Sequence, residues 1–301
     1  MDLGLILPSY RAGASAEGID AAADAAERLG WHTIWTTDHV LPGPEASSEY
    51  GRLFDAVSTL AYLAGRTSRV RLGLSVLVVP MRNAVVLARE LATIDLLSRG
   101  RLTAGVGVGW SAEEFANVGV AERFGRRGAY TDEAIGLWRH LWSGSREPWE
   151  GRFHHFRDVG FEPLPPQGAS LPIVIGGRSE AALRRAARLG DGYHASASSP
   201  AQLAVRNPIL RRAADEAGRT VPISARVRAR FGPAEIEGYQ LAGTPEQMAG
   251  EIGAFADQGV SALALDFQET DPELSVSLIE RFDREVIPAY REAASVRSGP
   301  A

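Results

Sequence analysis

Asp38 and His39 stand side by side at the end of an apolar run, in the segment TTDHV at residues 36–40. A histidine titrates near neutral pH and a neighbouring carboxylate shifts that titration, so the pair suits general acid–base catalysis. The same pair also occurs in exposed turns, and the sequence leaves both interpretations open. Tyr10 follows the apolar run at 3–7, where a tyrosine either lines a pocket or packs half-buried.

A glycine-rich segment, GVGVGW at 105–110, looks at first like a phosphate-binding loop. Gly107 and Gly109 begin a match to the loose dinucleotide fingerprint GxGxxG/A. A dinucleotide site also needs a second strand that ends in an acidic residue about 20 residues later. A helical pattern at 126–142 follows instead, so we reject that site. The glycines still allow a ligand to approach the backbone closely.

A second glycine pair lies in IGGRS at 175–179. Gly176 and Gly177 precede Arg178 and Ser179, and Ser179 is placed as the N-cap of a helix. The free N–H groups and positive dipole end of a helix N-terminus, with an arginine alongside, predict an anion site. A plain glycine turn between a strand and a helix is the alternative.

The sequence lacks the residues that several other kinds of active site require. The chain has no cysteine and no lysine, which excludes thiolate metal sites, a cysteine nucleophile and a Schiff-base lysine. No GxSxG elbow, paired carboxylates or P-loop is present, and the six histidines lack metal-ligand spacing, so we expect no metal. This pattern is typical of a cofactor enzyme, in which the protein positions the reacting group.

These residues must be positioned by the surrounding elements, which alternate between short apolar runs and helical patterns. Near-continuous apolar runs are typical of parallel strands buried on both faces. Eight such units in 301 residues predict a single-domain α/β protein over residues 1–301, a (β/α)8 TIM barrel with insertions in the βα loops; a doubly wound sheet is the runner-up. The expected strands are 3–7, 32–36, 70–79, 101–108, 172–176, 192–196, 223–230 and 261–267.

Two irregular stretches interrupt this alternation. We expect residues 143–171 to form an insertion after the fourth helix, and 40–53 to be irregular. The last helical face is predicted from Leu274, Leu278 and Phe282. In a barrel the active site lies at the carboxyl ends of the strands.

The composition is that of an ordinary globular protein, with 45% hydrophobic and 23% charged residues. A formal net charge of −5 argues against nucleic-acid binding. No apolar run reaches the length of a membrane span, so we expect no membrane association and a cytoplasmic location.

The chain resembles the luciferase-like flavin and deazaflavin oxidoreductases, especially the branch that uses the deazaflavin coenzyme F420. The resemblance runs in family order through residues 25–39, 77–115, 126–142, 172–194 and 243–260. It implies a (β/α)8 barrel, usually a homodimer, with the coenzyme (8-hydroxy-5-deazaflavin) lying across the carboxyl ends of the strands. Hydride would pass between that coenzyme and a small organic substrate.

The resemblance also implies roles for individual residues. Ser75–Val76, inside the third strand, matches a non-proline cis peptide behind the coenzyme ring; from the residues alone, Ser75 is either buried and hydrogen-bonded or part of a bulge. Asp38 matches a coenzyme contact and His39 a proton donor or acceptor. The remaining matches are Gly107 and Gly109 beside the coenzyme tail, and Gly176, Gly177 and Arg178 at its phosphate.

Trp110 marks a departure from the sugar-phosphate dehydrogenases of this family, which have a glutamate there. We therefore expect another activity and a more apolar or aromatic substrate pocket. The residues expected to line it are Tyr10, Trp35, Trp110, His194 and Arg228.

Two alternatives use the same barrel. One is a monooxygenase that uses reduced FMN and oxygen, because a flavin has nitrogen where a deazaflavin has the carbon that makes it a hydride carrier. The other is a non-catalytic barrel that binds a flavin as a carrier or sensor.

Overall fold

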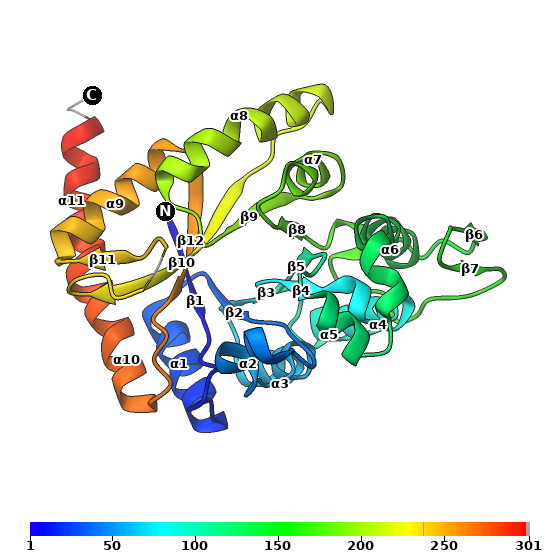
Figure 1. Cartoon of the computed structure of the whole chain (residues 1–301), viewed down its shortest axis with the longest axis horizontal. Helices are drawn as coiled ribbons and strands as arrows, with labels where there is room; N and C mark the ends of the chain where they lie inside the picture. The colour runs from blue at the N-terminus through cyan, green and yellow to red at the C-terminus, as the bar shows by residue number, and fades with distance from the viewer. Residues whose placement is uncertain (237, 299–301) are drawn as a thin grey trace.

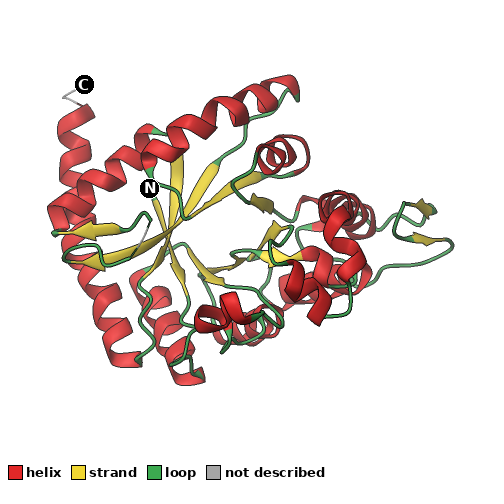
Figure 2. Ribbon diagram, viewed as in Figure 1, coloured by secondary structure: helices red, strands yellow, loops and turns green. Residues whose placement is uncertain are grey.

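Eight parallel strands close into a barrel that helices surround (Figures 1 and 2). The computed structural model describes residues 1–236 and 238–298. Each strand pairs with its neighbour in chain order, and pairing of β9 with β10 and of β12 with β1 completes the ring. The strands are β1 (Asp2–Ile6), β2 (Thr33–Thr36), β3 (Arg71–Leu74), β5 (Leu102–Gly107), β8 (Ile173–Gly176), β9 (Gly192–Ser196), β10 (Ile223–Phe231) and β12 (Val260–Asp266). All eight predicted strands, and the barrel, are confirmed.

The third predicted strand is interrupted where its serine lies. β3 ends at Leu74, a cis peptide joins Ser75 to Val76, and β4 (Leu77–Val78) then continues alongside β5. The cis peptide expected from the resemblance is therefore present.

We call the end of the barrel at which the carboxyl ends of the strands lie the mouth. Trp35 fills the barrel interior below it. A β-carbon on Gly4 would lie 2.6 Å from its Nε1, and one on Gly73 would lie 2.2 Å from its Cε3. The two neighbouring strands therefore need glycine at these positions, because the indole occupies the space of a side chain. The ring also stacks on His194, with ring centroids 4.7 Å apart.

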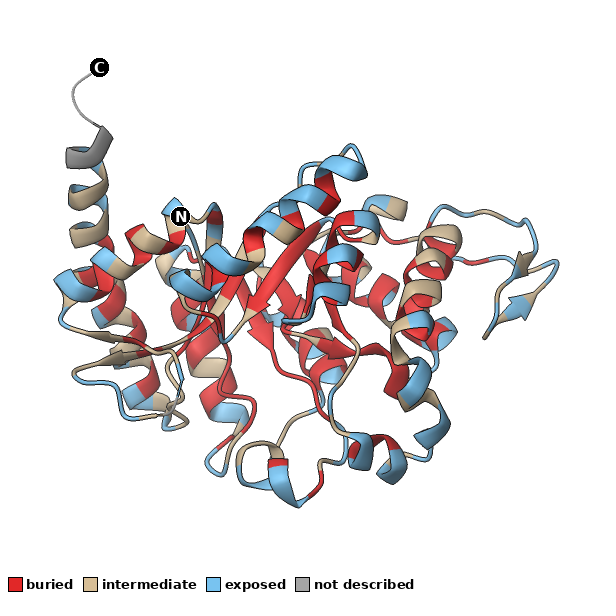
Figure 3. Ribbon diagram, turned by 45° about the horizontal axis from the view of Figure 1, so that its top comes forward, coloured by how far each residue is buried: buried red, intermediate tan, exposed pale blue. Residues whose placement is uncertain are grey.

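The barrel helices bury one face each against the strands, as Figure 3 shows by the red inner surfaces. They are α1 (Ala16–Leu29), α3 (Ala56–Arg66), α4 (Ala84–Leu97), α6 (Arg127–Trp142), α7 (Glu180–Leu189), α8 (Pro200–Glu216), α9 (Pro245–Asp257) and α10 (Pro272–Arg281), followed by η4 (Phe282–Val286) and α11 (Ile287–Ser298). The face predicted for α10 is wrong at Leu274, which is 57% exposed. The buried stripe is Ser275, Ile279 and Phe282, because the helix presents the next residue along to the barrel.

Short additional helices and a short strand lie in the loops that follow the barrel strands. After β2, residues 40–53 include a short helix, α2 (Pro44–Tyr50), which the sequence did not suggest. After β5 come α5 (Ala112–Asn117) and η2 (Ala121–Arg126), and β11 (Leu241–Gly243) pairs with β10. These lie in βα loops, at the mouth.

The insertion predicted at 143–171 follows α6, as expected, and so enters at the other end of the barrel. It contains an antiparallel pair, β6 (Trp149–Glu150) and β7 (His155–Phe156), and the turn η3 (Gly168–Ser170). Among the described helices, none is long and apolar enough to cross a membrane.

Candidate active site

His39 is held at the mouth by a buried glutamate that sequence reasoning missed. Its Nδ1 lies 2.8 Å from Oε2 of Glu114, and the other carboxylate oxygen, Oε1, accepts from the Val40 N–H at 2.6 Å. His39 is 7% exposed and Glu114 only 1%. Burial opposes ionisation of Glu114, but the hydrogen bonds from His39 and Val40 outweigh it and hold the pKa of that carboxyl below its ordinary value.

This arrangement assigns the two ring nitrogens of His39 different tasks. An ionised carboxylate only accepts hydrogen bonds, so Nδ1 must carry the hydrogen that faces Glu114. Nε2 is then the ring nitrogen that does not face Glu114.

A pattern in the sequence could have pointed to Glu114. It stands three residues after Ser111, the N-cap of α5, whose side chain accepts from the Glu114 N–H. This S-x-x-E spacing predicts a capping box, in which the glutamate side chain turns back to the cap. Here it turns to His39 instead, and only the folded chain brings these two residues together.

The carboxylate of Asp38 is bonded within the protein, and the coenzyme contact expected for this residue stays a prediction. Arg82 donates to both carboxylate oxygens, at 2.7 and 2.8 Å, and the Val78 N–H donates to Oδ2 at 2.8 Å. The side chain is fully buried. Burial raises the pKa of Asp38, and the ion pair with Arg82 opposes that rise. Asp38 therefore ties the end of β2 to the segment after the cis peptide.

Ser75 is held from below by a histidine and an arginine. Its hydroxyl lies 2.9 Å from Nε2 of His194, whose Nδ1 lies 2.7 Å from the hydroxyl of Ser224. Arg226 donates to the carbonyl oxygen of Ser75 at 2.9 Å. Burial, with the nearby charge of Arg226, lowers the pKa of His194 to about 3, so its ring is neutral.

His194 and Trp35 thus lie in the barrel interior, beneath the mouth. His194 is 1% exposed and both of its ring nitrogens have partners. Trp35 borders a cavity of about 190 Å³ at the opposite, N-terminal end of the barrel. The substrate-pocket role expected for both residues stays a prediction, because alternation along a strand does not reveal the depth of a side chain in a barrel.

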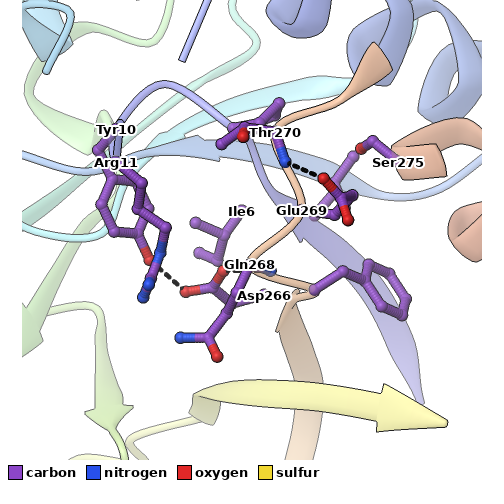
Figure 4. A pocket seen from close by; sticks show the side chains of 11 residues that line it. Ile6, Tyr10, Arg11, Asp266, Gln268, Glu269, Thr270 and Ser275 are labelled. Carbon is purple, nitrogen blue, oxygen red and sulfur yellow. Dashed lines mark hydrogen bonds between the residues drawn. The ribbon is translucent and has the colours of Figure 1, made fainter. Parts of the chain in front are cut away.

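Tyr10 belongs to a buried charged cluster (Figure 4). Its hydroxyl donates to Oδ2 of Asp266 at 2.5 Å, and Arg226 donates to both of these side chains, at 2.7 and 2.9 Å. Burial, together with the negative charge of Asp266, raises the pKa of Tyr10. Burial opposes ionisation of Asp266, but Arg226 and the Tyr10 hydroxyl lower its pKa on balance. The tyrosine is therefore neutral and the carboxylate charged.

The glycines of the mouth make room for Val76. A β-carbon on Gly107 would lie 2.7 Å from one Val76 methyl, and one on Gly176 would lie 2.8 Å from the other. The half-buried valine therefore rests between two bare strand ends. Gly109 and Gly177 have φ of 76° and 124°, which favours glycine.

The predicted anion site has the expected parts. Ser179 caps α7 by accepting from the Ala182 N–H at 3.3 Å, and Arg178 beside it is exposed.

Two further residues expected in the substrate pocket are partly open to solvent. Trp110 is 55% exposed, with its ring centroid 6.0 Å from that of His39. Arg228 lies at the mouth, where it donates to Glu49 of α2 at 2.8 Å. Within the described residues, no cluster of potential metal ligands is found.

Comparison with known proteins identifies the family. The profile described as "Luciferase-like monooxygenase" matches residues 1–234, more than half of the chain. This chain belongs to the luciferase-like monooxygenase family. Its relatives in that family include an F420-dependent glucose-6-phosphate dehydrogenase from Kineococcus radiotolerans, 34% identical over 203 residues. That match covers 65% of this chain and only 57% of the relative.

Other known proteins match over most of their length. An uncharacterised protein of Mycobacterium tuberculosis is 28% identical over 286 residues, 88% of this chain and 93% of the relative. The solved structure of an F420-dependent secondary alcohol dehydrogenase with an F420–acetone adduct has a TM-score of 0.81 at 20% identity, covering 96% of this chain and 99% of that one. A monooxygenase from Streptomyces bottropensis has a TM-score of 0.80 at 24% identity, covering 96% and 100%. At these identities the structures establish the fold.

Proposed function

We propose that this protein is an oxidoreductase dependent on coenzyme F420, which transfers hydride between the coenzyme and a small organic substrate. The observation that carries the proposal is a buried acid–base pair, His39 and Glu114, beside a glycine-bordered floor at Val76. The F420-dependent dehydrogenases among its relatives support this reading of the site.

The residues at the mouth fit a flat coenzyme with a phosphate-bearing tail. Gly107 and Gly176 project no side chain, so the floor between them is the Val76 side chain. Arg178 and the capped N-terminus of α7 would hold the phosphate, because an exposed guanidinium and free N–H groups favour an anion there. When bound, the coenzyme supplies a two-electron hydride carrier.

The protein's own contribution is to position groups and to move a proton. Glu114 fixes the ring of His39, so that Nε2 gives or takes the proton at the substrate atom that balances hydride transfer. Arg226 and His194 hold Ser75 in place beneath the coenzyme site. We expect the direction to be from reduced coenzyme to an unsaturated acceptor.

A monooxygenase that uses reduced FMN is the second candidate. The family profile carries that activity in its description, and a solved relative, 17% identical with a TM-score of 0.79, is a Baeyer–Villiger monooxygenase in complex with FMN. Trp110 argues against the glucose-6-phosphate activity named for the curated relatives, because the resemblance implies a glutamate at this position in the sugar-phosphate dehydrogenases.

The deciding experiment is a parallel titration with F420 and with FMN, followed by turnover of the coenzyme that binds. Tight binding of F420 and its oxidation, without oxygen, in the presence of an unsaturated acceptor support the proposal. Oxygen consumption with reduced FMN and a substrate would establish the monooxygenase. Binding of either cofactor with no substrate-dependent oxidation would leave a non-catalytic carrier.

We also propose that the protein is a homodimer that acts in the cytoplasm. Both proposals rest on the resemblance to this family. Sedimentation at twice the mass of one chain would support the dimer, and a single-chain mass at micromolar concentration would contradict it.

A further inference from the structure

Two arginines at the mouth converge on one carboxylate oxygen. Arg11, just after β1, and Arg228, in β10, donate to Oε1 of Glu49 at 2.6 and 2.8 Å. Gln268 faces the same guanidinium groups: with its amide oxygen toward them, it accepts from Arg228 Nε at 2.9 Å and from Arg11 Nη2 at 2.6 Å. Two positive charges thus meet one negative charge.

The arginine pair is partly exposed to solvent, and one of its hydrogen-bond donors has no partner among the described residues. The side chains of Arg11, Arg228 and Glu49 are 26%, 32% and 26% exposed. Arg11 Nε is shut off from solvent and has no hydrogen-bond partner within the part of the chain that the structure describes. Buried donors normally have partners, so a spare donor beside two converging guanidinium groups points to a ligand with more acceptor oxygens.

The helix that supplies Glu49 also covers the acid–base pair. The ring of Tyr50, the next residue of α2, lies 4.2 Å from that of His39 and stacks on Tyr10 at 5.5 Å, measured between centroids. The ring of Tyr50 therefore packs beside a His39 that is only 7% exposed. Gly43 and Gly51 bound α2 at its two ends, where backbone rotation is least restricted.

We propose that Arg11 and Arg228 bind a carboxylate of the substrate, and that Glu49 occupies their site until the substrate displaces it. Displacement of Glu49 moves α2 away from His39, so binding of the acid group opens the site to the rest of the molecule. This inference rests on the proposed function. It identifies the substrate class as a small organic acid.

The chemistry of the surroundings favours a carboxylate on an apolar or aromatic body. A carboxylate ligand replaces Glu49 with the same charge and oxygen geometry, so the ion pairs are exchanged and no arginine is left without a partner. The rings of Tyr10 and Tyr50 stack on each other beside Arg11, and the ring of Trp110 lies 6.0 Å from that of His39 between centroids, which suits an apolar body.

The test uses benzoate as a probe, titrated by calorimetry into the protein without coenzyme, with neutral benzamide as its partner. Glu49→Gln removes the internal competitor, so benzoate should bind about tenfold more tightly. Arg228→Gln should weaken benzoate binding about tenfold, and neither change should alter benzamide. Glu216→Gln is the matched control, because Glu216 is a similarly ion-paired but exposed glutamate at the end of α8, away from the mouth.

Hydrogen exchange provides the second measurement. The amides of α2 should exchange faster in Glu49→Gln and in native protein saturated with benzoate, while those of α8 stay unchanged. Equal benzoate affinity in the native protein and both variants would overturn the proposal, as would no binding at all or unchanged exchange in α2. Tighter binding of phenyl phosphate than of benzoate would overturn the carboxylate assignment.

These outcomes separate this inference from the proposed function. The benzoate titration needs no coenzyme, so a failure to bind F420 leaves its result intact. Conversely, F420 binding and turnover of a neutral acceptor, without benzoate binding, would retain the activity and remove the acid-binding role.

Discussion

The environment of His39 decides what its imidazole can do. Its Nδ1 is occupied by Glu114, so in the proposed function the proton is exchanged at Nε2. An exposed histidine in a turn would present either nitrogen. The adjacent pair of Asp38 and His39, which first suggested acid–base chemistry, is not the functional pair: Asp38 bonds to Arg82, and a glutamate 75 positions away bonds to His39.

Removing either member of the pair should reduce turnover without loss of coenzyme binding. We expect His39→Ala to lower kcat about 100-fold or more, since a positioned acid–base group contributes on this order. Glu114→Gln should lower it about tenfold, because the amide can still hold the ring but lacks the charge that stabilises its protonated form. Single-turnover kinetics with reduced F420 would measure both.

His155→Ala is the matched control, since His155 is exposed in β7 and far from the mouth in sequence and structure. Turnover unchanged in His39→Ala with an authentic substrate would remove this histidine from the mechanism.

Val76 explains the glycines at the mouth better than a phosphate loop does. Gly176→Ala should lower the free energy of unfolding by about 1–3 kcal/mol, because the new methyl overlaps a Val76 methyl in a packed site. Adding Val76→Ala should recover part of that loss, and urea unfolding of the native protein, of Gly176→Ala and of the double variant measures it. Gly65→Ala, in α3 with open space around it, should be neutral or stabilising. A loss in the double variant as large as in Gly176→Ala would contradict the overlap.

At the scale of elements, a buried ion pair connects β2 to the turn after β4. Asp38 and Arg82 join η1 (Val79–Met81) and its following residue to the strand that ends at the mouth. The apolar run predicted β2 itself, since all four of its residues are buried. It did not predict which way Asp38 would turn, because either side of a strand end is sterically open.

Asp38→Ala should destabilise the protein by about 3–5 kcal/mol, since it leaves the Arg82 guanidinium partly buried without its main partner. The midpoint of urea unfolding measures this loss. Asp24→Ala, which removes an exposed partner of Arg66, should cost at most about 1 kcal/mol. Similar losses of unfolding free energy in the two variants would show that the buried ion pair contributes no more than an exposed one.

For the molecule as a whole, the polar interior of the barrel makes stability depend on pH. The folded-state pKa of His194 is about 3, against about 6.5 in an unfolded chain. Between these values the unfolded chain binds a proton that the folded protein excludes, so the stability from this group is complete above pH 6.5 and is lost as pH falls towards 3.

From pH 7 to pH 5 the native protein should lose about 2 kcal/mol of unfolding free energy through His194. His194→Gln should flatten the stability profile over this interval, and urea unfolding at several pH values measures it. His155→Gln, exposed in both states, should keep the native slope. An unchanged slope in His194→Gln would show that other groups cause the dependence.

The sequence alone predicted the barrel, the positions of its strands and the helical faces around it. Eight buried runs, alternating with helical faces, leave few other ways to bury the apolar surface, so the strand positions and the location of the mouth followed from local pattern. The family resemblance added the cis peptide at Ser75–Val76, which no periodicity reveals.

Only the tertiary structure decided the partners of polar side chains. Glu114 reaches His39, Arg226 reaches Ser75, and Glu49 reaches Arg11 and Arg228 across gaps of many residues. The physical reason is that a buried charge must find a partner in space, and closure of the barrel sets which side chains meet there. Local sequence pattern predicts whether a strand is buried, but it does not predict the distances between polar side chains that lie far apart in the sequence.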